Sequence, residues 1–84
     1  MIIQLLNNQT VIYTYDTETK KIDIKSEQLG KQLAAGVQIP EANRAAFAGR
    51  KIIKLEDDAE LFHNAFNDFI FPKLNQEVFH WELI

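Results

Sequence analysis

The chain has 84 residues, of which 46% are apolar, nine are cations, twelve are anions and none is cysteine, so its formal net charge is −3. A chain of this length holds one hydrophobic core, and we expect a single small globular domain over residues 1–84. The absence of cysteine excludes disulfide frameworks, thiolate metal sites and thiol nucleophiles. No apolar run approaches the roughly 18 residues of a membrane span, and Met1–Leu6 lacks the basic flank of a signal peptide, so the expected location is the cytoplasm, away from membranes.

The beginning of the chain has the pattern of three strands. Residues 2–6 are a short apolar run, and residues 10–15 alternate Val, Tyr and Tyr with Thr, Ile and Thr. Between them, Asn-Asn-Gln at residues 7–9 tolerates left-handed dihedral angles and predicts a β-hairpin. Residues 21–25 alternate isoleucine with charged side chains, which predicts a third strand and an antiparallel meander with one solvated face.

Two helices and a strand are expected in the middle of the chain. Ser26 is a typical N-cap and Gly36 suits the left-handed residue after a helix, so the first helix lies between them. Pro40 fits the first position of a second, short helix that ends at Gly49. Residues 51–55 then alternate as in a half-exposed strand.

The clearest pattern is a long helix followed by a strand. Asp57 as N-cap and Glu60 three positions later resemble a capping box, and the helix is expected to run to Ile70, before Pro72. Residues 78–83 alternate apolar and polar side chains of high strand propensity, which predicts a final strand. The apolar half of the helix is Leu61, Phe62, Ala65, Phe66, Phe69 and Ile70, and the polar half is Glu60, His63, Asn64, Asn67 and Asp68.

These elements predict an α+β fold in the order strand, strand, strand, helix, helix, strand, helix, strand. A right-handed crossover through the long helix would place residues 51–55 and 78–83 in parallel strands. The expected architecture is therefore a mixed, mainly antiparallel sheet of about five strands with the helices packed on one face.

Charge is unevenly distributed along the chain. Residues 1–19 carry a net charge of −2, residues 20–54 of +5 and residues 55–84 of −6. A basic face and an acidic face that meet different partners, or that meet each other in a dimer, would have this pattern. Charges that cancel locally in the folded chain are the simpler interpretation, which we favour.

Two pairs of side chains have the spacing of metal ligands. Glu60 and His63 lie three apart on the long helix, and His80 and Glu82 lie two apart on the last strand, so each pair shares a face. We favour the alternative that His63 lies on a solvated helix face and that His80 points outward. No nucleophile, base and orienting group converge, and the three glycines form no nucleotide-binding loop. We therefore expect no cofactor and no catalytic residue, and a small metal-dependent enzyme is only the third hypothesis.

The densest basic segment lies between Arg44 and Lys54. Together with Arg50 and Lys51, these side chains suggest a contact with an anion, a nucleic acid or a protein partner. The acidic balance of the chain and the absence of a nucleic-acid-binding motif weigh against nucleic acid. A nucleic-acid- or phosphate-binding accessory domain is therefore the second hypothesis.

Apolar groups exceed what the predicted core needs. That core joins the phenylalanines of the long helix to Phe79 and Trp81 of the last strand. An apolar excess and edge strands with few charges, such as residues 1–6 or 78–83, favour contacts between proteins, including a homo-oligomer. The leading hypothesis is therefore a non-enzymatic protein–protein interaction or regulatory module that binds a partner or itself. The groups left over are Val11, Tyr13, Tyr15, Phe71 and Ile84, of which Tyr13, Tyr15 and Phe71 are the expected apolar contacts.

Overall fold

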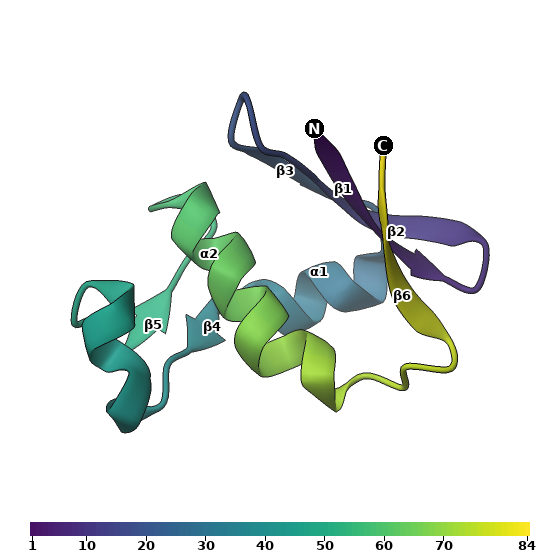
Figure 1. Cartoon of the computed structure of the whole chain (residues 1–84). Helices are drawn as coiled ribbons and strands as arrows, with labels where there is room; N and C mark the ends of the chain where they lie inside the picture. The colour runs from purple at the N-terminus through teal and green to yellow at the C-terminus, as the bar shows by residue number, and fades with distance from the viewer.

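The main sheet of the structure is built from four strands. The computed structural model describes all residues, 1–84, and orders the antiparallel strands β3-β2-β1-β6 (Figure 1). The predicted N-terminal meander is confirmed, and its two turns pass through Asn8 and Lys20, which have φ angles of 55° and 61°. The strands are β1 (Ile2–Asn7), β2 (Thr10–Asp16), β3 (Lys21–Ile24) and β6 (Phe79–Leu83).

The first helix, α1 (Glu27–Leu33), has the predicted signals at both ends. The Ser26 hydroxyl accepts a hydrogen bond from the Leu29 N–H, 3.2 Å away, and so caps the first turn. Gly36 follows the helix with a φ angle of +92°. A Cβ atom at Gly36 would lie 2.7 Å from the Ile53 carbonyl oxygen, so this close approach of two backbones requires glycine.

The predicted long helix is present, but it contains three kinds of turn. It starts one residue later than expected, because the side chain of Asp58, rather than Asp57, accepts a hydrogen bond from the Leu61 N–H at 3.1 Å. No helix of the structure has both the length and the apolar character to cross a bilayer. The successive segments are α2 (Ala59–Ala65), the π-helix η2 (Phe66–Ile70) and the 3-10 helix η3 (Phe71–Lys73).

A second, two-stranded sheet forms a small lobe beside the helices (Figure 1). The predicted strand at 51–55 is reduced to β5 (Ile52–Ile53), which pairs with β4 (Val37–Gln38). Between them, the predicted second helix is the 3-10 helix η1 (Glu41–Phe47). The strand β4 was not predicted, because two residues are too few to show an alternating pattern.

The predicted parallel crossover is wrong. β6 pairs antiparallel with β1, with Trp81 opposite Leu5, and β5 does not join the main sheet. β5 has only two residues and its partner is β4, so it provides no strand for β6 to follow. After η3, residues 74–78 return the chain to the edge next to β1. The main sheet is therefore a purely antiparallel sheet of four strands, where a mixed sheet of five was expected.

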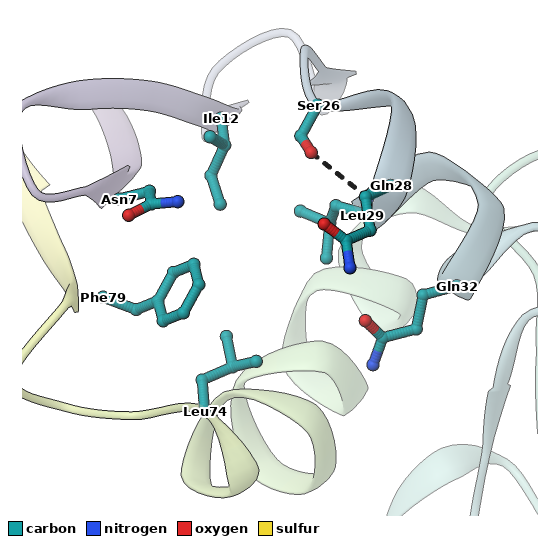
Figure 2. Close-up of a pocket in the computed structure, with 8 residues that line it drawn as sticks. All are labelled: Asn7, Ile12, Ser26, Gln28, Leu29, Gln32, Leu74 and Phe79. Atoms are coloured by element: carbon teal, nitrogen blue, oxygen red, sulfur yellow. Dashed lines mark hydrogen bonds between the residues drawn. The ribbon is translucent and has the colours of Figure 1, made fainter.

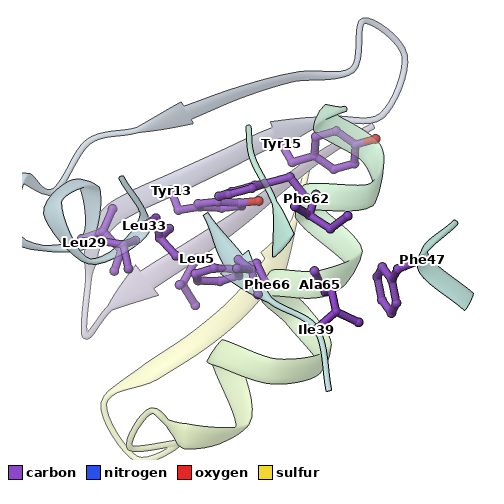
Figure 3. Packing of buried hydrophobic residues seen from close by; sticks show 13 residues of the cluster. Leu5, Tyr13, Tyr15, Leu29, Leu33, Ile39, Phe47, Phe62, Ala65 and Phe66 are labelled. Carbon is purple, nitrogen blue, oxygen red and sulfur yellow. The ribbon is translucent and has the colours of Figure 1, made fainter. Parts of the chain in front are cut away.

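The hydrophobic core lies between the inner face of the main sheet and the helices (Figure 3). The pairing of the strands places Leu5, Tyr13 and Trp81 side by side on that face. Phe66 stacks on Tyr13 with ring centroids 4.8 Å apart and meets Trp81 edge-on at 5.9 Å. The small lobe completes the core with Val37, Ile39, Phe47 and Ile53.

Candidate interaction surface

The buried polar side chain of the core is His63, on the helix face that was expected to be solvated. It is 8% exposed, stacks on Tyr15 with centroids 4.4 Å apart, and its Nδ1 lies 2.9 Å from the Tyr13 hydroxyl. Burial lowers the pKa of His63 and raises the pKa of Tyr13 far above its usual range, so both rings are neutral at neutral pH. The prediction that His63 is solvated failed because His63 borders the apolar stripe of the helix. It lies three residues before Phe66 and seven before Ile70, and residues at these spacings share one helix face.

The two predicted metal-ligand pairs differ in geometry. The Glu60 carboxylate accepts a hydrogen bond from Lys20 Nζ at 2.6 Å, which raises the pKa of Lys20, while His63 is bonded inside the core. The first pair is therefore not brought together. His80 and Glu82 are brought together on the outer face of β6, where Nε2 lies 3.2 Å from Oε2. No group of three or more His, Cys, Asp or Glu side chains that could hold a metal ion occurs in the structure.

Two of the three predicted apolar contact residues lie inside the molecule. Tyr13 is 0% exposed and Tyr15 is 4% exposed, because β2 directs both rings toward α2. In contrast to the prediction, neither ring is accessible to a partner. Phe71 is half-buried and packs against Trp81 with ring centroids 5.3 Å apart. Its remaining surface is accessible.

The predicted basic segment lies on the small lobe. Arg44 is in the last turn of η1, Arg50 and Lys51 precede β5, and Lys54 follows it. Arg50, Lys51 and Lys54 are exposed, whereas Arg44 is half-buried and its Nε is buried without a hydrogen-bond partner. None of these four cations forms an ion pair. The small lobe therefore carries unneutralised positive charge.

Two open cavities lie next to the helices, and neither brings a hydroxyl nucleophile to a base. The first, of about 170 Å³, lies between α1 and the main sheet and has no titratable side chain in its lining (Figure 2). Its only hydroxyl, Ser26, already caps α1. The second, of about 370 Å³, has Asp68 and Lys73 as its only charged groups. The polar groups of the first cavity are Asn7, Ser26, Gln28 and Gln32.

Exposed large hydrophobic side chains gather at one corner of the main sheet, where the two ends of the chain lie side by side (Figure 1). The Ile84 N–H donates to the Ile2 carbonyl oxygen at 2.8 Å, and the Ile2 N–H donates back at 3.4 Å. Only one exposed large hydrophobic side chain, Ile52 at 36%, lies elsewhere. The other four, which we call the apolar corner, are Met1 (53% exposed), Ile2 (37%), Leu83 (66%) and Ile84 (74%).

Strand β6 lies at the end of the strand order and so has a free edge beside the apolar corner. Ile84 and Ile2 exchange both of their backbone hydrogen bonds. The backbone N–H and C=O groups of the even-numbered residues in this segment therefore point toward β1, and those of the odd-numbered residues point toward the free edge. The Phe79 N–H already donates to the Asn75 carbonyl oxygen at 2.8 Å. The residues whose backbone groups face the free edge are Phe79, Trp81 and Leu83.

Comparisons of the chain with protein-family models, with curated proteins and with solved structures found no match. Function is therefore inferred from the geometry described above. The sequence predicted edge strands at residues 1–6 and 78–83: β6 is an edge strand, whereas β1 lies between β2 and β6, so the first expectation is wrong. It also predicted an unabsorbed apolar group at Ile84, but not the apolar corner. Pairing between the two ends of a chain has no local sequence signal. The same is true of the contact between Tyr13 and His63, which are fifty residues apart.

Proposed function

We propose that the chain is a protein-interaction module that binds through the apolar corner and the free edge of β6. The observation that carries this proposal is that four of the five exposed large hydrophobic side chains adjoin a strand with unpaired backbone groups. Fully burying a Leu or Ile side chain stabilises by about 1.5–3 kcal/mol. A partner that adds a strand to β6 would gain this burial together with main-chain hydrogen bonds.

The unequal protection of the two sheet edges supports the proposal. Edge strands that avoid association are short or carry lysine, proline or a bulge. The opposite edge, β3, has four residues and begins with Lys21, which follows Lys20 directly. β6 has five residues without Lys, Arg or Pro, and the bulge of the sheet lies between β1 and β2, away from this edge. The open edge of β6 is thus the one suited to accept a strand.

Site-specific photo-cross-linking tests the proposal. Benzoylphenylalanine replaces Leu83 in the full chain, and a matched probe replaces Ile52, the exposed hydrophobic residue outside the corner. We expect discrete protein adducts from position 83 after irradiation of expressing cells, and fewer from position 52. Equal or absent adducts at position 83 contradict the proposal, and adducts confined to position 52 place the contact on the small lobe instead.

A second candidate function is anion binding by the small lobe. The observation that favours it is that Arg44, Arg50, Lys51 and Lys54 all lack ion-pair partners. It predicts retention on heparin that falls steeply as salt rises. The double variant R50E/K51E should then elute much earlier than the wild type, and flow-through of the wild type at low salt would exclude this candidate.

A further inference from the structure

We infer that the occupant of the β6 edge is a second copy of the chain, paired antiparallel with its own β6 about a two-fold axis through Trp81. This inference rests on the proposed function, since it names the partner of the same edge. The pairing would join two four-stranded sheets into one continuous sheet, with both helical layers on the same side. It would also cover Leu83 and Ile84, the two most exposed large hydrophobic side chains.

The backbone of β6 is suited to this register. In a two-fold antiparallel pair, the central residue exchanges hydrogen bonds with its own copy, which requires that its N–H and C=O face the free edge. Trp81 meets this requirement. The Leu83 N–H and the Phe79 carbonyl also face the free edge. In this register the Leu83 N–H of one chain lies opposite the Phe79 carbonyl of the partner, and the reverse holds for the second chain. Only the Leu83 carbonyl lacks a strand donor, because the Phe79 N–H donates to Asn75.

The side chains of residues 78–84, Val-Phe-His-Trp-Glu-Leu-Ile, are self-complementary in this register. On the outer face, His80 lies opposite the partner's Glu82, in the kind of pair where side chains approach most closely. The imidazole and the carboxylate are a matched donor and acceptor, as their 3.2 Å contact within one chain indicates. On the inner face, Phe79 lies opposite the partner's Leu83. On the outer face, beyond His80 and Glu82, Val78 lies opposite the partner's Ile84.

The neighbouring symmetric registers are less favourable. A two-fold axis at Glu82 would place two carboxylates opposite each other, and like charges directly opposite each other destabilise a strand pair. An axis at His80 would place Glu82 opposite the partner's apolar Val78. An axis at Phe79 would place Leu83 opposite the polar Asn75. An axis at Leu83 would leave most of β6 unpaired. Trp81 is the centre that matches apolar with apolar groups and acid with imidazole.

The contact between His80 and the partner's Glu82 provides the principal test. Size-exclusion chromatography with light scattering, on the full chain over a concentration series, is expected to give a mass that rises from 9.7 kDa to twice that value. E82K places a lysine opposite the partner's His80, and H80E places two carboxylates opposite each other. Each single variant loses two symmetry-related contacts, so we expect the dissociation constant to rise about tenfold or more. The double variant H80E/E82K places a carboxylate opposite a lysine and is expected to restore the dimer.

Controls separate the interface from the fold. His80 and Glu82 have side chains 47% and 52% exposed, so these substitutions should leave the circular dichroism spectrum of the single chain unchanged. Trp81 is the only tryptophan, and its fluorescence should shift with the same concentration dependence as the mass.

The register has its own test, because the chain has no cysteine. Directly opposite residues of an antiparallel pair are close enough for a disulfide. A mixture of chains with His80→Cys and chains with Glu82→Cys should therefore form a mixed disulfide faster than either variant forms a disulfide alone. Equal rates in the three samples would contradict an axis at Trp81.

Two results overturn the inference but leave the proposed function intact. The first is a monomeric mass at every concentration together with a different protein cross-linked at position 83. The second is a dimer that E82K and H80E leave unchanged, while position 83 still cross-links a protein. A monomer without any adduct at position 83 overturns both. A dimer that follows the charge exchange, with the chain itself as the adduct, supports both.

Discussion

Tyr13 and Tyr15 offer a matched pair for testing how the buried histidine is stabilised. Both rings lie on the inner face of β2 and both contact His63, at centroid distances of 5.8 and 4.4 Å. Only the Tyr13 hydroxyl is bonded to the imidazole, whereas the buried Tyr15 hydroxyl has no hydrogen-bond partner. We predict that Tyr13→Phe destabilises the fold and that Tyr15→Phe does not.

The expected magnitude follows from the burial of the two hydroxyls. Tyr13→Phe removes the hydroxyl and leaves Nδ1 of His63 without its partner in a region where Tyr13 is 0% exposed. An unsatisfied buried polar group costs about 1–3 kcal/mol, so we expect a loss of about 2 kcal/mol in the free energy of unfolding. Tyr15→Phe removes a hydroxyl that already lacks a bond, so its effect should stay within about 0.5 kcal/mol of zero.

Equilibrium urea unfolding at neutral pH measures both values, with the fluorescence of Trp81 as the probe, since its ring lies 5.7 Å from that of Tyr13. All chains are compared at one protein concentration, so that any self-association affects them alike. Equal losses for the two variants, or a negligible loss for Tyr13→Phe, would refute the assignment of the stabilising hydrogen bond to Tyr13 and His63.

Two further predictions concern the helix that carries His63. Because burial lowers the pKa of His63, the unfolded chain binds more protons than the folded chain below about pH 6.5, the ordinary value for histidine. The free energy of unfolding should therefore fall as the pH drops through this value, by at most about 1.4 kcal/mol per pH unit, and His63→Asn should reduce the slope measured by urea titration. Asp58→Ala, which removes the N-cap of α2, should cost about 1 kcal/mol in the same assay, and an equal cost for Asp57→Ala would contradict the assignment of the cap.

Local patterns in the sequence predicted the elements whose partners are adjacent in the chain. The hairpin of β1 and β2 and the cap at Ser26 depend on residues only a few positions apart, and both are confirmed. The pairing of Leu5 with Trp81 depends on the return of a distant strand, which periodicity does not encode. The apolar corner follows from that same pairing, so it too was missed. His63 was predicted on the solvated helix face but is buried. It lies at the border of the apolar stripe, where the packing around the helix, and not the spacing of residues, decides whether a side chain is buried or exposed.

The central position of β1 has a consequence for the order of folding. Its two neighbours in the sheet come from opposite ends of the sequence: β2 follows after a two-residue turn, whereas β6 is almost a full chain length away. A hairpin closes within about 1–10 µs, while a pairing between distant segments must first overcome the entropy of a large loop. Until β6 arrives, β1 is itself an open edge, and the inner face lacks Trp81. A short linker from Ile84 to Met1 would convert this slow closure into a local hairpin.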